Sequence, residues 1–273
     1  RSRSSVSLNG RVSSLIYYSH VESVNYDKIG NKEYSVKNNH EYQFTGNIVN
    51  RRNIYLIVLE SFIDPRLLED YSYDRTPLSA SLHSSFNFME SSFSHPVSPS
   101  YGGRTAQAEF ELLTGLPALA KVNSIEFNVM QGTVVNSFVQ KFNVEGYQTQ
   151  ALISTNPSYF NSRNAYRSLG FNHIDYLSEK HGKINVEGDI FLFDGVLFDE
   201  IEKMSETRLD KESKPFFFYA LGIYGHKDFY RNSEIRPDVV KCNPHNDDIN
   251  KIANQFYYRT KAIAKFLKNI HKI

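Results

Sequence analysis

Apolar residues form two kinds of pattern after residue 52. Continuous apolar runs bounded by polar residues occur in NIYLIVL at 53–59 and PFFFYALG at 215–222, and such runs are typical of strands buried on both faces of a parallel sheet. We also interpret YQTQALIS at 147–154 and FNHIDY at 171–176 as strands. The sequence therefore predicts a central sheet built from these runs.

Segments with helical spacing of apolar residues alternate with the strands. We predict helices over 133–145, over SRNAYRSL at 162–169 and over 190–205, each followed by a strand, and a long final helix over 247–273. Another segment of good helix formers, TAQAEFELL, begins at Thr105. This alternation predicts an α/β fold with a largely parallel central sheet and helices on both faces.

The first 52 residues differ from the rest of the chain. They are rich in Ser, Asn, Lys and Tyr with a single short apolar patch, so we interpret 1–52 as a linker or outer-layer segment and 53–273 as one α/β domain. The basic start, RSRSSVSLNGR, is not followed by an apolar region and does not resemble a signal peptide. We expect that the chain is cut from a longer protein.

Charge and cysteine content exclude several classes of protein. The 31 Lys and Arg residues nearly balance the 30 Asp and Glu residues, which argues against a dedicated nucleic-acid binder. A single cysteine, Cys242, allows neither an internal disulfide nor a multi-cysteine zinc site. The longest apolar runs are far shorter than the roughly 20 residues that span a bilayer.

Polar residues that directly follow predicted strands are the first candidates for chemistry, because ligands of parallel sheets bind beyond the carboxyl ends of the strands. Glu60 follows the first strand and offers a hard oxygen ligand for a divalent cation, with Asp64 as a nearby substitute. An exposed carboxylate without a function is the alternative, and from position alone it is the more common case.

Thr105 is the second candidate. It begins a predicted helix after the loop Tyr101-Gly102-Gly103, and a helix N-terminus favours negative charge. Its hydroxyl, activated by a metal, suits a nucleophile that attacks phosphorus or sulfur. An ordinary N-cap threonine is the alternative.

Three further residues have side chains suited to an anionic substrate. His226 lies in the loop after PFFFYALG and is placed to bind an anion or transfer a proton, while Asn161 and Arg163 offer an amide and a guanidinium to a phosphate. A surface histidine and a solvated helix start are the alternatives. The other histidines show no metal-ligand spacing.

In their order along the chain, several motifs are similar to one known family. NIYLIVLESF, RTPLSASL, GGRTAQAEFELLTGLP, FNSRNAYRSLGF and PFFFYALGIYGHKDF together resemble the extracytoplasmic catalytic domain of the lipoteichoic acid synthase and phosphoglycerol transferase family. That family belongs to the alkaline phosphatase and sulfatase superfamily. The resemblance covers roughly residues 53–270, and the LES and G-x-T-x-x-A-E-F motifs are its most specific parts.

The resemblance implies a role for each candidate. Glu60 would bind a divalent metal, manganese first and magnesium or zinc as alternatives, and Thr105 would be both metal ligand and nucleophile. His226 would contact the substrate phosphate. Asn161 matches the family's asparagine, but Ser162 occupies the usual arginine position and Arg163 lies one residue later.

The resemblance also implies substrates and a location. The enzyme would move a phosphoglycerol or related head group from a phospholipid to a hydroxyl of a glycan or polymer. It would work outside the cytoplasm, in the periplasm or at the cell surface. Its membrane anchor would be a segment absent from this chain, and no nucleic acid would take part.

One family motif is missing. The family completes its metal site with a Gly-Asp-His motif after a later strand, and this chain has none. Two oxygen ligands fall short of the usual six of a hard cation. We therefore expect an incomplete C-terminal part, weak metal binding and little turnover by the 273-residue chain alone.

Two other functions stay open. A sulfatase or phosphodiesterase of the same superfamily would hydrolyse its substrate rather than transfer a group. The formylglycine type is disfavoured, because the cysteine lies in CNPHN rather than in C-x-P-x-R. A non-catalytic domain that retains the fold and a remnant pocket is the third possibility.

Overall fold

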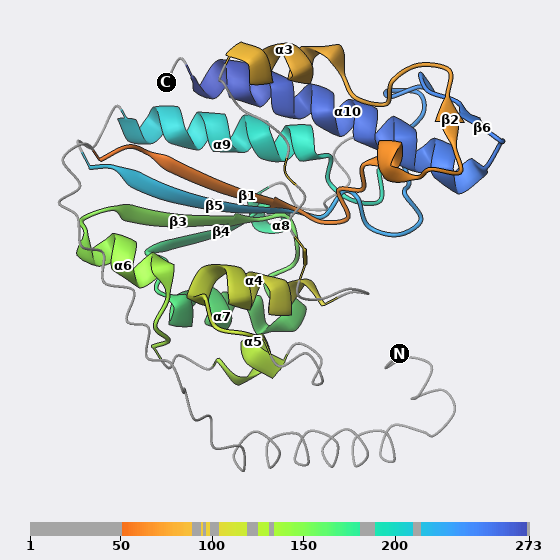
Figure 1. Cartoon of the computed structure of the whole chain (residues 1–273). Helices are drawn as coiled ribbons and strands as arrows, with labels where there is room; N and C mark the ends of the chain where they lie inside the picture. The colour runs from red at the N-terminus through yellow and green to blue at the C-terminus, as the bar shows by residue number, and fades with distance from the viewer. Residues whose placement is uncertain are drawn as a thin grey trace, which may run out of the picture. The chain divides into compact units, whose positions relative to one another are not determined.

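A four-stranded parallel sheet forms the centre of the molecule (Figure 1). The computed structural model describes residues 51–88, 94, 97–98, 104–118, 125–130, 134–180, 189–209 and 214–271. The sheet order is β1-β5-β3-β4, with bounds β1 Ile54–Leu59, β5 Phe216–Gly222, β3 Gln148–Ile153 and β4 His173–Tyr176. All three pairings are parallel. The predicted α/β fold with a parallel central sheet is thus confirmed.

Helices cover both faces of this sheet (Figure 1). One layer consists of α3 Ala80–Phe88, α9 Asp194–Leu209 and α10 Asp247–Ile270. The other contains α4 Thr105–Thr114, α5 Ile125–Val129, α6 Phe138–Val144 and α7 Ser162–Leu169. The remaining elements are short: η1 Pro65–Leu67, η2 Tyr159–Asn161, α8 Leu177–Lys180, and an antiparallel pair of β2 Ser72–Tyr73 and β6 Cys242–Asn243.

Strand β5 shows why the predicted runs are continuous. Phe216, Phe218 and Ala220 join the apolar cluster that contains residues of α9 and α10. The intervening residues of β5, including Phe217 and Tyr219, join the cluster on the α4 and α7 side. Both faces of the strand are therefore buried, because successive side chains point to opposite faces.

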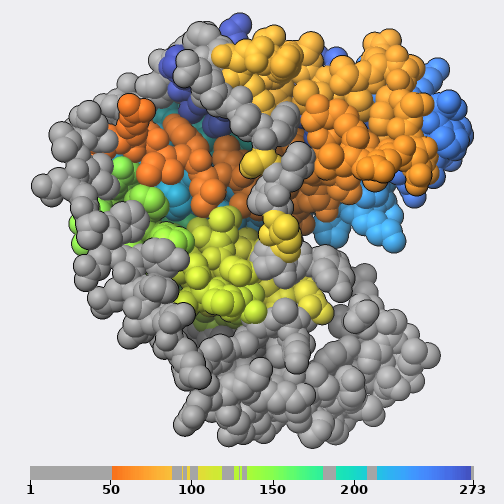
Figure 2. Space-filling model, in the orientation of Figure 1, coloured from red at the N-terminus to blue at the C-terminus, as the bar shows by residue number. Residues whose placement is uncertain are grey.

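Strand β1 has β5 as its partner on one side and is partly exposed along its whole length. The space-filling view shows the orange segment around β1 at the molecular surface (Figure 2). In contrast, every residue of β5 is buried. The difference follows from position, since β1 is an edge strand of the described sheet and β5 is central.

Most predicted elements are present at nearly their expected bounds, and two helices start later. The helix expected over 190–205 is α9, Asp194–Leu209. The helix expected over 133–145 begins at Phe138, because the Ser137 hydroxyl accepts a hydrogen bond from the amide of Gln140 and caps the helix there. Val134 is 73% exposed instead of lying on a buried helical stripe. Gly146, with φ 83°, follows the helix as expected.

Some predictions lie outside the described residues. These are nearly all of the predicted linker 1–52 and the loop residues Tyr101, Gly102 and Gly103. The residues from Arg51 onward form one compact unit. Within the described part of the chain, no helix combines the length and the apolarity that crossing a bilayer requires.

Candidate functional site

Glu60 lies where the carboxyl ends of β1 and β5 meet. It follows β1 directly, and its backbone amide donates a 2.8 Å hydrogen bond to the carbonyl of Gly222, the last residue of β5. This bond continues the strand pairing by one residue and fixes where Glu60 leaves the sheet. The position agrees with the rule that ligands of parallel sheets bind at this edge.

Thr105 lies beside Glu60, at the start of helix α4. It is the first residue of α4, and Arg104 occupies the N-cap position, so Thr105 is not the N-cap threonine of the alternative reading. Its hydroxyl donates a hydrogen bond to the Glu60 carboxylate. The two predicted ligands therefore converge in the structure, while their chemical roles stay predictions.

The Glu60 carboxyl is largely removed from water, with a side chain that is 12% exposed. Burial raises the pKa of Glu60, and the hydrogen bond from Thr105 and the charges of His226 and Arg259 partly oppose that rise. A carboxylate in this setting favours a positive charge beside it.

His226 is the third predicted residue at this site. Its Nε2 lies 3.9 Å from a carboxylate oxygen of Glu60, and 42% of its side chain is exposed. The imidazole packs against the ring of Phe191 at a centroid distance of 5.3 Å. His226 thus sits at the rim of the site with its ring near Glu60 and open to a ligand.

Strained backbone collects at this edge of the sheet. Among the described residues, all non-glycine residues with positive φ lie in loops that follow β1, β3 or β5: Ser61, Phe160, Asn161, Asp228 and Phe229. Non-glycine residues seldom adopt this conformation, and such strain concentrates at functional sites. The pattern agrees with a site formed by these loops.

The side chains of Asn161 and Arg163 bind other parts of the protein instead of Glu60 or Thr105. The Asn161 amide donates to the carbonyls of Phe127 and Met130, at 2.9 and 3.0 Å. Arg163 pairs with Glu179 and lies over the ring of Tyr176. These contacts hold η2 and α7 in place, and the predicted phosphate contacts of both residues stay predictions.

Ser162 and Asp64, which lie near predicted site residues in the sequence, also bind local structural partners. Ser162, at the family's arginine position, is buried and shares a 2.9 Å hydrogen bond with the Tyr176 hydroxyl. Asp64 accepts a hydrogen bond from the amide of Arg66 and caps the short helix η1. An ion pair with the Arg66 side chain also engages this carboxylate, so Asp64 is a poorer metal ligand than Glu60.

Sequence reasoning missed a buried ion pair beneath Glu60. Arg259 of α10 is 1% exposed and donates to Asp194, the first residue of α9, at 2.6 Å. The same guanidinium donates to the backbone carbonyls of Glu60 and Ser61. The only sequence signal was a pair of charged residues within helices that cover the sheet.

It also missed a buried carboxyl beneath Thr105. Glu109 lies one helical turn after Thr105 and accepts hydrogen bonds from the hydroxyls of Tyr166 and Tyr219. Burial raises the pKa of Glu109 to about 7, the two tyrosine hydrogen bonds oppose that rise, and the charge of Glu60 adds to it. The spacing of Thr105 and Glu109 on one helix face was the available signal.

The donors at this site suit a hard divalent cation. Glu60 and Thr105 offer a desolvated carboxylate and a hydroxyl in mutual contact, and oxygen donors are what such cations prefer. In the described ranges, no group of three or more His, Cys, Asp or Glu side chains is arranged to hold a metal ion. The residues present thus fit such an ion as part of a ligand set.

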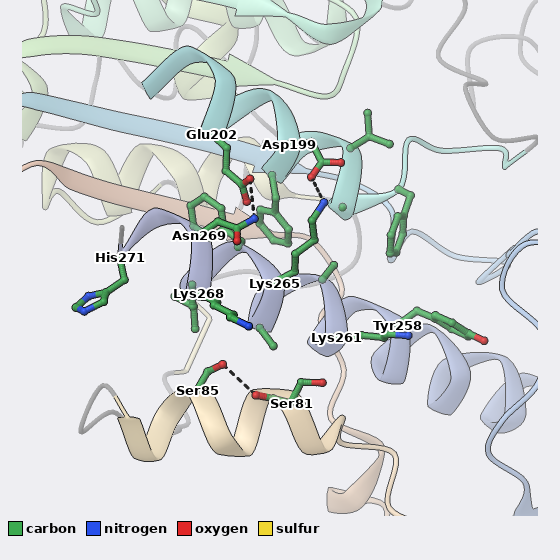
Figure 3. A pocket seen from close by; sticks show the side chains of 18 of the residues that line it. Ser81, Ser85, Asp199, Glu202, Tyr258, Lys261, Lys265, Lys268, Asn269 and His271 are labelled. Atoms are coloured by element: carbon green, nitrogen blue, oxygen red, sulfur yellow. Dashed lines mark hydrogen bonds and ion pairs between the residues drawn. The ribbon is translucent and has the colours of Figure 1, made fainter. Parts of the chain in front are cut away.

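A separate groove of about 1110 Å³ lies between α3, α9 and α10, and neither Glu60, Thr105 nor His226 lines it (Figure 3). Two pairs of its polar side chains contact each other. Lys265 pairs with Asp199 at 2.5 Å, and Asn269 donates to Glu202 at 3.0 Å (Figure 3). We assign no role to this groove.

Solved structures with a similar fold include those of two bacterial enzymes. The lipoteichoic acid synthase LtaP from Listeria monocytogenes is 15% identical with a TM-score of 0.63, over 81% of this chain and 52% of that one. The phosphoglycerol transferase GacH from Streptococcus pyogenes, solved with sn-glycerol-1-phosphate, is 19% identical with a TM-score of 0.61, over 84% and 59%. Similarity at this level establishes the fold.

A sequence relative and a family model add to this comparison. A putative cyclic β-1,2-glucan modification protein of Rhizobium meliloti (strain 1021) is 28% identical over 66% of this chain and 26% of its own length. The chain thus spans about a quarter of that relative and about half of the two solved structures. The Sulfatase family model matches residues 52–272. The chain therefore belongs to the sulfatase family, as its resemblance to the alkaline phosphatase and sulfatase superfamily predicted.

Proposed function

We propose that the protein is a metal-dependent transferase. It moves a phosphoglycerol or related phosphorylated head group from a phospholipid to a hydroxyl of a glycan or polymer. The observation that carries this proposal is the contact between the Thr105 hydroxyl and the Glu60 carboxylate at the strand ends. The glycerol phosphate bound to GacH and the glucan-modifying relative support the choice of substrates.

Thr105 is the nucleophile in this proposal. Its oxygen forms a bond to the phosphorus of the donor, the bond from phosphorus to the diacylglycerol oxygen breaks, and diacylglycerol leaves with a proton. The head group is then held as a phosphate ester of Thr105. In the second step the acceptor hydroxyl attacks that phosphorus, the bond to Thr105 breaks, and the threonine regains a proton.

Glu60 and Thr105 would hold a divalent cation, manganese first and magnesium or zinc as alternatives. When bound, it supplies positive charge that favours the ionised threonine oxygen and the charge that develops on the phosphate. Glu60 also keeps the Thr105 hydroxyl oriented through the hydrogen bond between them. Burial of the Glu60 side chain limits the access of water.

His226 would bind the phosphate. Its exposed ring lies near Glu60, and an imidazole N–H donates well to a phosphate oxygen. In the structure the Asn161 amide donates to backbone carbonyls and Arg163 pairs with Glu179. The proposal therefore rests on Thr105, Glu60 and His226.

The lipid donor sets the cellular location in this proposal. Phospholipid head groups and envelope glycans meet outside the cytoplasm, so we place the enzyme in the periplasm or at the cell surface. It would be anchored to a membrane in the whole protein. Because the chain spans only part of its relatives, activity is attributed to the whole protein that contains it.

Mass spectrometry of Thr105 tests the transfer. The whole protein is incubated with phosphatidylglycerol vesicles and Mn²⁺ without acceptor, and peptides that contain residue 105 are analysed. Transfer is supported by a phosphoglycerol adduct on Thr105 that disappears when a β-glucan is added, together with phosphoglycerol found on the glucan. Adduct formation followed by release of glycerol phosphate to water, with none on the glucan, indicates a hydrolase. A sulfated Thr105 with an aryl sulfate, and no phospholipid adduct, rejects the proposal.

A further inference from the structure

Arg259 contacts three successive residues of the turn that carries Glu60. Its Nη2 donates to the Glu60 carbonyl at 3.0 Å and its Nη1 to the Ser61 carbonyl at 3.1 Å. The guanidinium also lies over the Phe62 ring, 4.8 Å from the centroid. One planar group from α10 therefore fixes the chain on both sides of the strained Ser61, whose φ is 46°.

The guanidinium is itself held from the opposite side. Its Nε donates to Asp194 at 2.6 Å, and this pair is buried, with side chains 2% and 0% exposed. Three donor directions of one rigid fork are thus used on three different acceptors, which a lysine ammonium on a flexible stem cannot reproduce. Removing one partner of such a buried pair is costly.

The loop after β5 closes around the same contact. A Cβ added to Gly225 would lie 2.2 Å from Nη1 of Arg259 and 2.5 Å from the carbonyl oxygen of Glu60. The backbone of Gly225 therefore fills the space beside the guanidinium, and His226 follows it directly. Arg259 connects the Glu60 turn, the His226 loop and helix α10.

We propose that Arg259 is a positioning residue that directs Glu60 toward Thr105 and the metal, with Asp194 fixing its orientation. This inference rests on the proposed function. A purely stabilising role is the alternative, and the chain offers a matched control for it. Arg236 forms a second buried ion pair, with Asp189, and contacts the rings of Phe193 and Tyr224.

Two measurements on the whole protein that contains this chain separate these roles. Arg259→Lys and Arg236→Lys are compared with the unaltered protein, each checked for folding by circular dichroism and thermal melting. Hydrogen–deuterium exchange reports the amides of Glu60 and Ile63, which donate to Gly222 and Ser61 in the structure. Isothermal titration with MnCl₂ alone reports the metal affinity.

We expect both variants to lower the melting temperature, but only Arg259→Lys to change the site. In that variant, exchange across residues 57–64 should become faster, and the Kd for Mn²⁺ should rise by at least about tenfold, as found for residues that orient metal ligands. Arg236→Lys should leave the Kd within roughly twofold and exchange in 57–64 unchanged. Equal changes in both variants, or no faster exchange in 57–64 with Arg259→Lys, would overturn the inference.

The two proposals can fail separately. If the unaltered whole protein binds no Mn²⁺, the metal part of the proposed function loses its support, while hydrogen exchange still decides whether Arg259 positions Glu60. If Arg259→Lys does not fold, Asp194→Asn replaces it, because this change keeps the guanidinium but removes the charge that orients it. A smaller increase in exchange in 57–64 supports the inference, and unchanged exchange rejects it.

Discussion

Glu60 and Thr105 meet at one edge of the sheet, but different buried contacts hold them on its two faces. On the α9 and α10 side, an ion pair of Arg259 and Asp194 fixes the Glu60 turn. On the α4 and α7 side, two tyrosine hydroxyls donate to the Glu109 carboxyl beneath Thr105. The Glu60 side of the site therefore depends on two opposite charges that compensate each other. The Thr105 side depends on a carboxyl whose hydrogen bonds come from neutral tyrosine hydroxyls.

This difference predicts different responses to pH. Glu109 is fully buried, and burial raises its pKa to about 7. Burial also raises the pKa of the Asp194 carboxyl, but the charge of Arg259 and its hydrogen bond oppose that rise. The stability of the contacts beneath Thr105 should therefore change with pH near neutrality, as Glu109 gains or loses its proton.

Removing the Thr105 hydroxyl has the largest expected effect, because it is the proposed nucleophile. Thr105→Val keeps the volume of the side chain and removes the oxygen, so transfer by the whole protein should fall by at least about 10³-fold. Head-group release from labelled phosphatidylglycerol measures this. Thr114→Val is the matched control, because its hydroxyl lies at the other end of α4, where it donates to the Phe110 carbonyl and accepts from the Leu116 amide. Retained transfer in Thr105→Val would exclude Thr105 as the nucleophile.

Breaking the Glu109 contacts should have the next largest effect. Glu109→Ala leaves the buried hydroxyls of Tyr166 and Tyr219 without their acceptor. The free energy of unfolding should fall by about 3 to 5 kcal/mol, since unsatisfied buried polar groups and a cavity both contribute. Urea unfolding followed by circular dichroism measures it. Glu109→Gln retains an acceptor oxygen and should lose much less; an equal loss would show that the hydrogen bonds do not matter.

The pH dependence of stability sharpens the comparison. A carboxyl whose pKa is raised from 4.5 to about 7 in the folded state binds its proton more tightly there than in the unfolded chain. Its contribution is full below about pH 4.5 and is lost as the pH rises to about 7, by roughly 3 kcal/mol in total. Urea unfolding at a series of pH values should show this decline, and Glu109→Gln should flatten it. An undiminished slope in Glu109→Gln would assign the decline to other groups.

The smallest expected effect concerns the rim of the site. His226→Gln removes the imidazole near Glu60 but keeps a hydrogen-bond donor, so kcat/KM should fall by about tenfold. His245→Gln is the control, because His245 is 75% exposed and pairs with Asp247 at the start of α10. Similar kinetics for both variants would remove His226 from the proposed phosphate contact.

The sequence alone predicted the layered fold and the place of the candidate site. A continuous apolar run such as PFFFYALG buries both of its faces only when helices cover the sheet on both sides. The strands and the α/β class were therefore predictable. The motifs around Glu60, Thr105 and His226 then indicated which strand ends and helix start would carry chemistry. The structure brings these three residues together.

Only the tertiary structure revealed what holds them. Periodicity treats charged residues of a covering helix as solvated, because a buried charge is costly unless a partner compensates it. Arg259 and Asp194 are 65 positions apart, and Arg259 lies 199 positions from the Glu60 carbonyl that it contacts. Glu109 likewise meets Tyr219 across 110 positions. Such partners are set by how the helices pack on the sheet, so no local pattern in the chain identifies them.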